Sequence, residues 1–130
     1  MLGVDASVVV GACLAASGFD PFRGESLVAP PLLWSEAASA IHELRWRGAI
    51  SAELGAASID RLDRAPVASR RPRHLIREAW RVADDLGWAK TYDAEYVALA
   101  RVLRCRLVTI DARLQRSASR IVEVIGPTEL

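Results

Sequence analysis

The sequence contains few of the residues that build disulfide frameworks, zinc centres or membrane spans. Its two cysteines, Cys13 and Cys105, show no CxxC spacing, and its two histidines, His42 and His74, have no ligand partner at zinc spacing. We therefore expect free thiols and no zinc site. No apolar run reaches the roughly 18 residues that cross a bilayer. The apolar start is interrupted at Asp5 and lacks a preceding basic segment, which excludes a usual signal peptide. These absences predict a cytoplasmic protein that does not contact a membrane.

An excess of charge of one sign is also missing, because 17 basic residues stand against 16 acidic ones. A net charge of +1 does not by itself indicate nucleic-acid binding. Lysine is nearly absent, however: 16 of the cations are arginine, and five of these lie within residues 61–73. Arginine binds phosphate in a bidentate way that lysine cannot reproduce. The cluster indicates a phosphate-contacting surface or, equally, a compositional bias of the genome.

The remaining composition suits one compact domain over residues 1–130, since 52% of the residues are hydrophobic and the mean hydropathy is +0.15. Short apolar runs alternate with segments of helical periodicity. We expect strands at 2–4, 27–29, 67–69, 107–110 and 121–125, and helices at 7–16, 31–47, 51–62, 73–86, 91–103 and just after Asp111. This alternation predicts an α/β fold in which helices cover both faces of a parallel sheet.

Two acids stand where a predicted strand is followed by a helix. Asp5 follows the first strand, and Asp111 follows the strand at 107–110. Ligands of open α/β sheets collect beyond the carboxyl ends of the strands, so we expect these side chains to meet in one crevice. Either acid alone is also explained as a residue that complements a helix dipole, and Ser7 is the expected cap of the first helix.

Two further acids lie on predicted helices. Glu36 borders the buried stripe of the second helix, where a carboxylate is costly unless another group satisfies it. Glu43, two turns further on, is a weaker candidate and fits a solvated or ion-paired side chain. Asp93 falls in the first turn of a helix that Thr91 is expected to cap, and the helix dipole explains this acid without any function. Only its combination with the other acids makes Asp93 a candidate site residue.

Four carboxylates in one crevice would repel one another and raise each other's pKa values. A hard divalent cation removes that penalty, and Mg²⁺ and Mn²⁺ prefer oxygen ligands. The sequence therefore predicts a magnesium or manganese site formed by Asp5, Glu36, Asp93 and Asp111. Without metal, we expect the same cluster to lower the stability of the fold.

These segments together resemble the PIN domain, and specifically the VapC toxins of bacterial VapBC toxin–antitoxin pairs. The resemblance covers essentially the whole chain. It is carried by residues 4–8 (VDASV), 34–38 (WSEAA), 91–100 (TYDAEYVALA) and 107–111 (LVTID) followed by Leu114. Each segment is weak alone, whereas four in this order in a chain of 130 residues are fairly specific.

The resemblance implies a three-layer α/β/α sandwich with a central, mostly parallel sheet, formed by a single PIN domain. It also implies endonucleolytic cleavage of RNA, homodimerisation, and inhibition by an antitoxin whose tail covers the site. Position by position, it assigns the catalytic, metal-binding acids to Asp5, Glu36, Asp93 and Asp111, and a hydroxyl beside the last acid to Thr109. The ion, or a pair of ions, would activate a water and stabilise charge on the scissile phosphate.

The sequence departs from the family pattern at two places. Ser39 stands where many relatives have asparagine, which puts a contact behind the metal ligands in doubt. Ala112 and Arg113 follow Asp111 where relatives can carry another acid, so we expect four acids rather than five.

Other functions fit less well. A receiver domain needs paired acids after its first strand and a lysine after a late strand, but Asp84 and Asp85 lie on a predicted helix and Lys90 is the only lysine. A haloacid-dehalogenase-type phosphatase needs a second acid at the position of Ser7. No glycine-rich phosphate loop is present. The remaining alternative is a catalytically inactive PIN-like module that binds RNA or a protein partner.

The second and third predicted helices carry more apolar residues than one buried stripe requires, namely Leu32, Trp34, Trp46, Ile50, Leu54, Ile59 and Leu62. An exposed apolar surface usually marks a binding site. The resemblance implies an antitoxin segment as its occupant, with a basic residue inserted among the acids.

Overall fold

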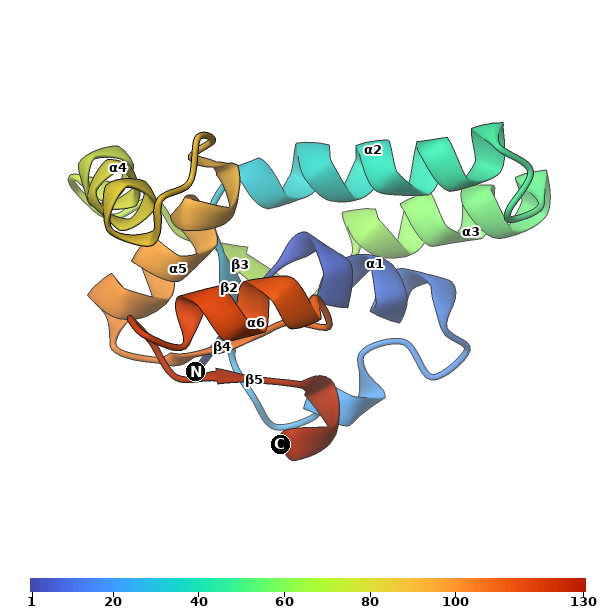
Figure 1. Cartoon of the computed structure of the whole chain (residues 1–130). Helices are drawn as coiled ribbons and strands as arrows, with labels where there is room; N and C mark the ends of the chain where they lie inside the picture. Colours follow the sequence, from blue (N-terminus) through green and yellow to red (C-terminus); the bar gives the residue numbers. More distant parts are fainter.

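The computed structural model describes all 130 residues and contains one five-stranded sheet (Figure 1). The strands are β1 (Leu2–Val4), β2 (Leu27–Ala29), β3 (Val67–Ser69), β4 (Arg106–Val108) and β5 (Val124–Ile125), in the order β3-β2-β1-β4-β5. Every neighbouring pair is parallel, so the predicted parallel sheet is confirmed. β1 is the central strand and β4 is its neighbour. The residues that follow these two strands therefore meet at one edge of the sheet.

Six α-helices cover the sheet: α1 (Ala6–Leu14), α2 (Leu32–Trp46), α3 (Ala52–Asp63), α4 (Leu75–Leu86), α5 (Tyr92–Leu103) and α6 (Ala112–Ala118). Because crossovers between parallel strands are right-handed in nearly all proteins, this strand order places α1, α2 and α3 on one face and α4, α5 and α6 on the other. The contacts agree, because α1, α2 and α3 pack against one another and α4 packs against α5. In Figure 1, α2 and α3 run side by side as a long hairpin. The expected three-layer α/β/α sandwich is confirmed.

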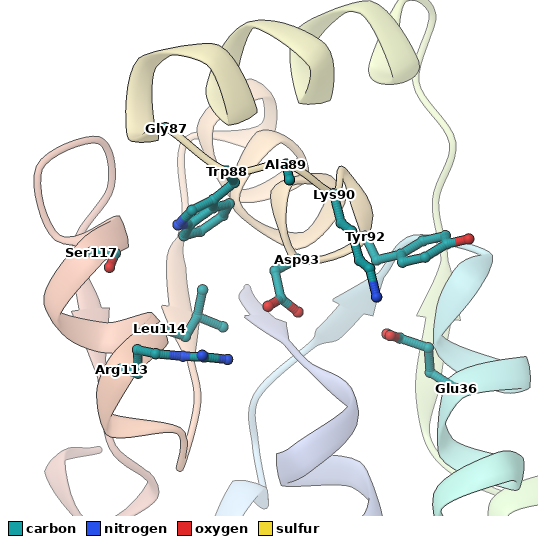
Figure 2. Close-up of a pocket in the computed structure, with 10 residues that line it drawn as sticks. All are labelled: Glu36, Gly87, Trp88, Ala89, Lys90, Tyr92, Asp93, Arg113, Leu114 and Ser117. Atoms are coloured by element: carbon teal, nitrogen blue, oxygen red, sulfur yellow. The ribbon is translucent and has the colours of Figure 1, made fainter.

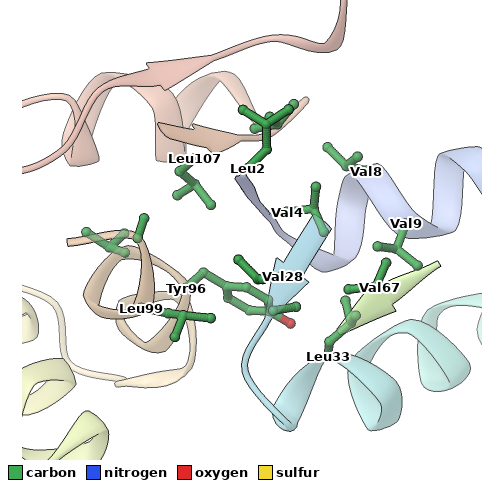
Figure 3. Packing of buried hydrophobic residues seen from close by; sticks show 14 of the residues in the cluster. Leu2, Val4, Val8, Val9, Val28, Leu33, Val67, Tyr96, Leu99 and Leu107 are labelled. Atoms are coloured by element: carbon green, nitrogen blue, oxygen red, sulfur yellow. The ribbon is translucent and has the colours of Figure 1, made fainter. Parts of the chain in front are cut away.

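β1 and β2 contain no polar side chain, and β4 is apolar apart from Arg106 at its start, because helices bury both faces of a parallel sheet. Leu2, Val4 and Leu107 are each at most 1% exposed. Figure 3 shows them between α1, which contributes Val8, and α5, which contributes Leu99. This core fixes the directions in which β1 and β4 leave the sheet. No helix combines the length and the apolarity that crossing a membrane requires.

Most predicted boundaries agree with the structure to within two residues, and the largest difference concerns β5. This strand begins at Val124 rather than at Ile121. The backbone N–H groups of Ile121 and Val122 both donate to the carbonyl of Ala118, so these residues belong to the turn after α6. Helix α4 begins at Leu75 because the preceding residue has a φ of 66°, which a right-handed helix does not include.

Two short 3₁₀ helices complete the chain, at Asp20–Phe22 and Pro127–Glu129.

Candidate active site

Asp5 is the most deeply buried of the four predicted acids, with 5% of its surface exposed. Its Oδ1 accepts hydrogen bonds from the N–H of Val8 at 3.1 Å and from the Ser7 hydroxyl at 2.6 Å, and its Oδ2 accepts one from the Thr109 hydroxyl at 2.5 Å. The bond from Val8 makes Asp5 the cap of α1, so the prediction that Ser7 caps this helix is wrong. Burial raises the pKa of Asp5, and the three hydrogen bonds oppose that rise. The same three hydrogen bonds fix the orientation of the Asp5 carboxylate.

Thr109 connects the ends of the two central strands. Its side chain is buried, and its hydroxyl donates to Asp5 while accepting a hydrogen bond from the N–H of Asp111 at 3.0 Å. The Ser7 hydroxyl makes a second link, because it donates to Asp5 and accepts from the N–H of Ile110 at 3.3 Å. Two hydroxyl groups thus hold the segment after β4 against the start of α1.

Asp111 and Asp93 differ in how they are held. Asp111 caps α6, since its Oδ1 accepts from the N–H groups of Arg113 and Leu114 at 2.9 and 3.2 Å. Asp93 lies in the first turn of α5 and its carboxylate has no hydrogen-bond partner. Thr91 occupies the N-cap position of α5 but makes no capping bond, contrary to the sequence prediction. Asp93 is therefore the least constrained of the four acids.

Glu36 is held by a residue of the opposite helical layer. Its Oε1 accepts a hydrogen bond of 2.5 Å from the hydroxyl of Tyr96, a buried residue of α5. Burial raises the pKa of Glu36, and the charges of Asp93 and Asp5 raise it further, whereas the bond from Tyr96 lowers it. The expectation that a carboxylate on this helix face needs a satisfying partner is confirmed.

A cavity of about 590 Å³ lies between the start of α5 and the helices α2 and α6. Figure 2 shows the carboxylates of Asp93 and Glu36 pointing into it, with Arg113 on one side of Asp93 and Lys90 on the other. Burial raises the pKa of Asp93, the charge of Asp111 adds to that rise, and the charge of Arg113 opposes it. Glu43 is exposed on α2 and does not line this cavity, which fits a solvated side chain.

The four predicted acids therefore share one electrostatic field, because Asp93 senses Asp111, Asp5 senses Asp93, and Glu36 senses both Asp5 and Asp93. Their donor atoms are all carboxylate oxygens, which is the ligand chemistry of Mg²⁺ and Mn²⁺. In this arrangement, however, no group of three or more acidic, histidine or cysteine side chains is close enough together to hold an ion. The residues fit a hard cation by chemistry and by charge, although their oxygens do not surround one point.

Three residues near the acids were not identified from the sequence. Tyr96 binds Glu36, Arg113 faces Asp93, and Glu95 has a pKa raised by burial and by the charge of Glu36. Arg71 opposes the rise at Glu95. Of these three residues, only Glu95 could have been found from the sequence, because it is a second acid in the first turn of the helix that contains Asp93.

Comparison with known proteins gives both sequence and structural relatives. The chain is 35% identical over 115 residues to the VapC ribonuclease Mb0985 of Mycobacterium bovis and to ribonuclease VapC9 of Mycobacterium tuberculosis, covering 88% of this chain and 88% of each relative. No protein-family model matches. Among solved structures, PAE2754 from Pyrobaculum aerophilum superimposes with a TM-score of 0.73 at 25% identity, covering 98% of this chain and 91% of that one.

Two solved complexes share the fold at lower sequence identity. FitAB bound to the IR36 DNA fragment has a TM-score of 0.68 at 13% identity, covering 100% of this chain and 97% of that one. VapBC2 from Rickettsia felis, bound to a DNA fragment from its promoter, has a TM-score of 0.66 at 9% identity, covering 97% and 98%. At these identities the similarity extends to the fold alone.

Proposed function

This chain belongs to the VapC ribonuclease family, and from that premise we propose that it is an endoribonuclease toxin whose activity depends on Mg²⁺ or Mn²⁺ held by Asp5, Glu36, Asp93 and Asp111. The observation that carries the proposal is that carboxylates from four separate elements, near the carboxyl ends of β1 and β4, influence one another's pKa values in pairs. When bound, a divalent cation lowers the pKa of a water and stabilises charge on a phosphate.

The residues of the chain contribute orientation and charge. Asp5 is the fixed member, because both of its oxygens accept hydrogen bonds and its backbone begins α1. Glu36 is held through one oxygen by Tyr96, so its second oxygen is available to a ligand. Asp93 has no hydrogen-bond partner and can turn toward an ion without breaking a contact. Burial is the main reason that the pKa values of these three acids are raised, and the charge of at least one neighbouring acid adds to each rise. A bound cation would relieve the part that comes from like charges.

A ribonuclease assay with and without metal tests the proposal. Purified protein should cleave RNA with Mg²⁺ or Mn²⁺ and lose this activity in EDTA, and Asp5→Asn, Glu36→Gln or Asp93→Asn should abolish it. Glu43→Gln is the matched control, because Glu43 is an exposed acid on the same helix as Glu36. Full activity in a site variant would remove that residue from the site. Metal-independent binding without any cleavage would establish the inactive binding module instead.

The same proposal includes an antitoxin partner and places it on the α2–α3 hairpin. A second cavity, of about 460 Å³, lies between these helices and is lined by Ile41, His42, Arg45 and Ile59, among others. Trp46, stacked on His42, is 80% exposed, and Ile59 is exposed as well. The other predicted residues of this surface are half-buried, except that Leu62 belongs to the core, so its assignment to the surface is wrong.

Ser39 also lines the α2–α3 cavity and is exposed there. Its position supports a contact with a partner more than a contact behind the metal ligands.

Co-expression with the cognate antitoxin should yield a stable complex with suppressed ribonuclease activity. Trp46→Ala should weaken that complex and leave cleavage of RNA by the free protein unchanged, whereas failure to co-purify with the wild-type chain would count heavily against a toxin. We further propose a homodimer that acts in the cytoplasm, and light scattering of the purified chain tests the first of these points.

A further inference from the structure

The cavity in Figure 2 is lined by aromatic and basic side chains as well as by carboxylates. We propose that Trp88, Tyr92, Lys90 and Arg113 bind two neighbouring nucleotides of single-stranded RNA, with the aromatic rings stacking on unpaired bases and the cations contacting phosphates. This inference rests on the proposed ribonuclease function, and it names the residues that would hold the substrate of that site.

The arrangement around Asp93 is two-sided. Figure 2 shows Trp88 and Arg113 on one side of Asp93, and Tyr92 and Lys90 on the other. An RNA strand that crosses the cavity over Asp93 would meet one ring and one cation on either side of it. The cavity volume of about 590 Å³ lies within the range of roughly 300–1,000 Å³ found for small-molecule sites.

The charges explain why cations are needed here. A phosphate that approaches Asp93 and Glu36 is repelled by both carboxylates. Lys90 and Arg113 are exposed and take part in none of the three ion pairs of the structure, so their charges remain available to a phosphate. The two cations offset part of the negative charge of the acids, which lowers the electrostatic cost of bringing an anionic substrate into the cavity.

The two rings are placed where a base can reach them. Tyr92 is 56% exposed and its hydroxyl makes no hydrogen bond, so neither burial nor a polar contact within the protein explains its position. Trp88 is half-buried, and its backbone is fixed by a Schellman motif in which its N–H donates to the carbonyl of Ala83 at 2.8 Å. Gly87 makes this turn possible with a φ of 70°. A ring held in place loses little freedom when a base stacks on it.

Unpaired bases expose the faces that aromatic side chains recognise, whereas a duplex hides them. The site therefore fits single-stranded RNA, such as a loop or an end, rather than a helix.

Fluorescence anisotropy of a short labelled single-stranded oligoribonucleotide, measured in EDTA, tests the subsite without cleavage. Tyr92→Leu and Trp88→Leu should each weaken binding about tenfold, as expected for the loss of one stacked base. Tyr92→Phe keeps the ring and should bind as wild type does. Lys90→Gln and Arg113→Gln should each make the salt dependence of binding less steep by about 0.7, the value for one phosphate contact on a single strand. Trp80→Leu and Arg101→Gln are the controls, since both residues are exposed and outside this cavity.

Thermal melts identify any variant that fails to fold, and Tyr92→Leu keeps the test decisive because Tyr92 is mostly exposed. Unchanged affinity in Tyr92→Leu, equal losses in the controls, or no binding of single-stranded RNA by the wild type would overturn the subsite. If the four cavity variants lose antitoxin binding but keep their affinity for RNA, the surface binds a protein, and the RNA subsite is overturned too. Cleavage with Mg²⁺ is measured separately: intact cleavage with unaffected affinity refutes the subsite alone, and ring-dependent binding without cleavage refutes the nuclease alone.

Discussion

The hydrogen bond between Tyr96 and Glu36 should contribute measurably to stability, and Tyr96→Phe removes it with almost no change in shape. A hydrogen bond to a charged group contributes about 1.5–3 kcal/mol. Glu36 is only half-buried and its freed oxygen can bind water, so we expect a loss near the lower end, about 1.5 kcal/mol. With an unfolding entropy of about 2.1 cal/mol/K per residue, a chain of 130 residues should melt about 5 °C lower.

The difference between wild type and Tyr96→Phe should depend on pH in a defined direction. The bond from Tyr96 lowers the pKa of Glu36, although burial and the charges of Asp93 and Asp5 keep that pKa above its ordinary value of 4.5. The stability that this bond contributes is therefore fully present when Glu36 is ionised, and it decreases as the pH falls through the pKa of the folded state. Glu95, whose pKa is raised by burial and by the charge of Glu36, also titrates in both proteins, so the two proteins are compared with each other at every pH.

The assay is thermal or urea unfolding of both proteins in EDTA, from pH 7.5 down to pH 4. Tyr92→Phe is the matched control, because it removes a hydroxyl that makes no hydrogen bond, and it should melt within about 1 °C of wild type. If Tyr96→Phe melts as the control does, or if its deficit grows on acidification, the charge-assisted bond is not the contribution inferred here.

Three other predictions concern the acids and the helix ends. Thr109→Val leaves buried Asp5 without one donor and should destabilise the protein by about 2–3 kcal/mol in urea unfolding, while an effect below about 0.5 kcal/mol would refute the bridge between the strand ends. In EDTA, the protein should become more stable as the pH falls from 7.5 toward 5, because the pKa values of Asp5, Glu36 and Asp93 are raised in the folded state and protonation therefore favours folding. Saturating Mg²⁺ should abolish this gain in stability. A steady loss of stability over the same pH range would contradict the prediction. Asp111→Ala should lower stability by about 1 kcal/mol through loss of the α6 cap, whereas Asp111→Asn, which can still cap, should not, and equal losses would argue against the capping role.

The local part of the fold follows from short stretches of sequence. The apolar run before Asp5 is enough to predict the end of β1, and the run before Asp111 places the end of β4 to within two residues. The helical period is enough to place Glu36 beside a buried stripe. Both signals concern residues within one or two turns of each other. For that reason the alternation of strands and helices, the parallel sheet and the resemblance to the PIN domain could all be predicted from the sequence.

The predictions of capping were less successful for a related reason. Asp5 and Ser7 can each begin the first helix, and the local sequence does not rank them. Ser7 is drawn to Asp5 and to the N–H of Ile110, which lies 103 positions away in the chain, so a distant segment decides which residue caps α1.

The sequence by itself determined the elements, their order and the identities of four acids that the family pattern marks. Only the tertiary structure decided how those acids are held and what surrounds them. Tyr96 meets Glu36 across 60 positions of sequence, and Arg113 meets Asp93 because α6 follows the strand next to β1. No local pattern encodes such meetings. The first arises because α2 and α5 pack onto opposite faces of one sheet, and the second because α5 and α6 lie on the same face, with their ends at the same edge.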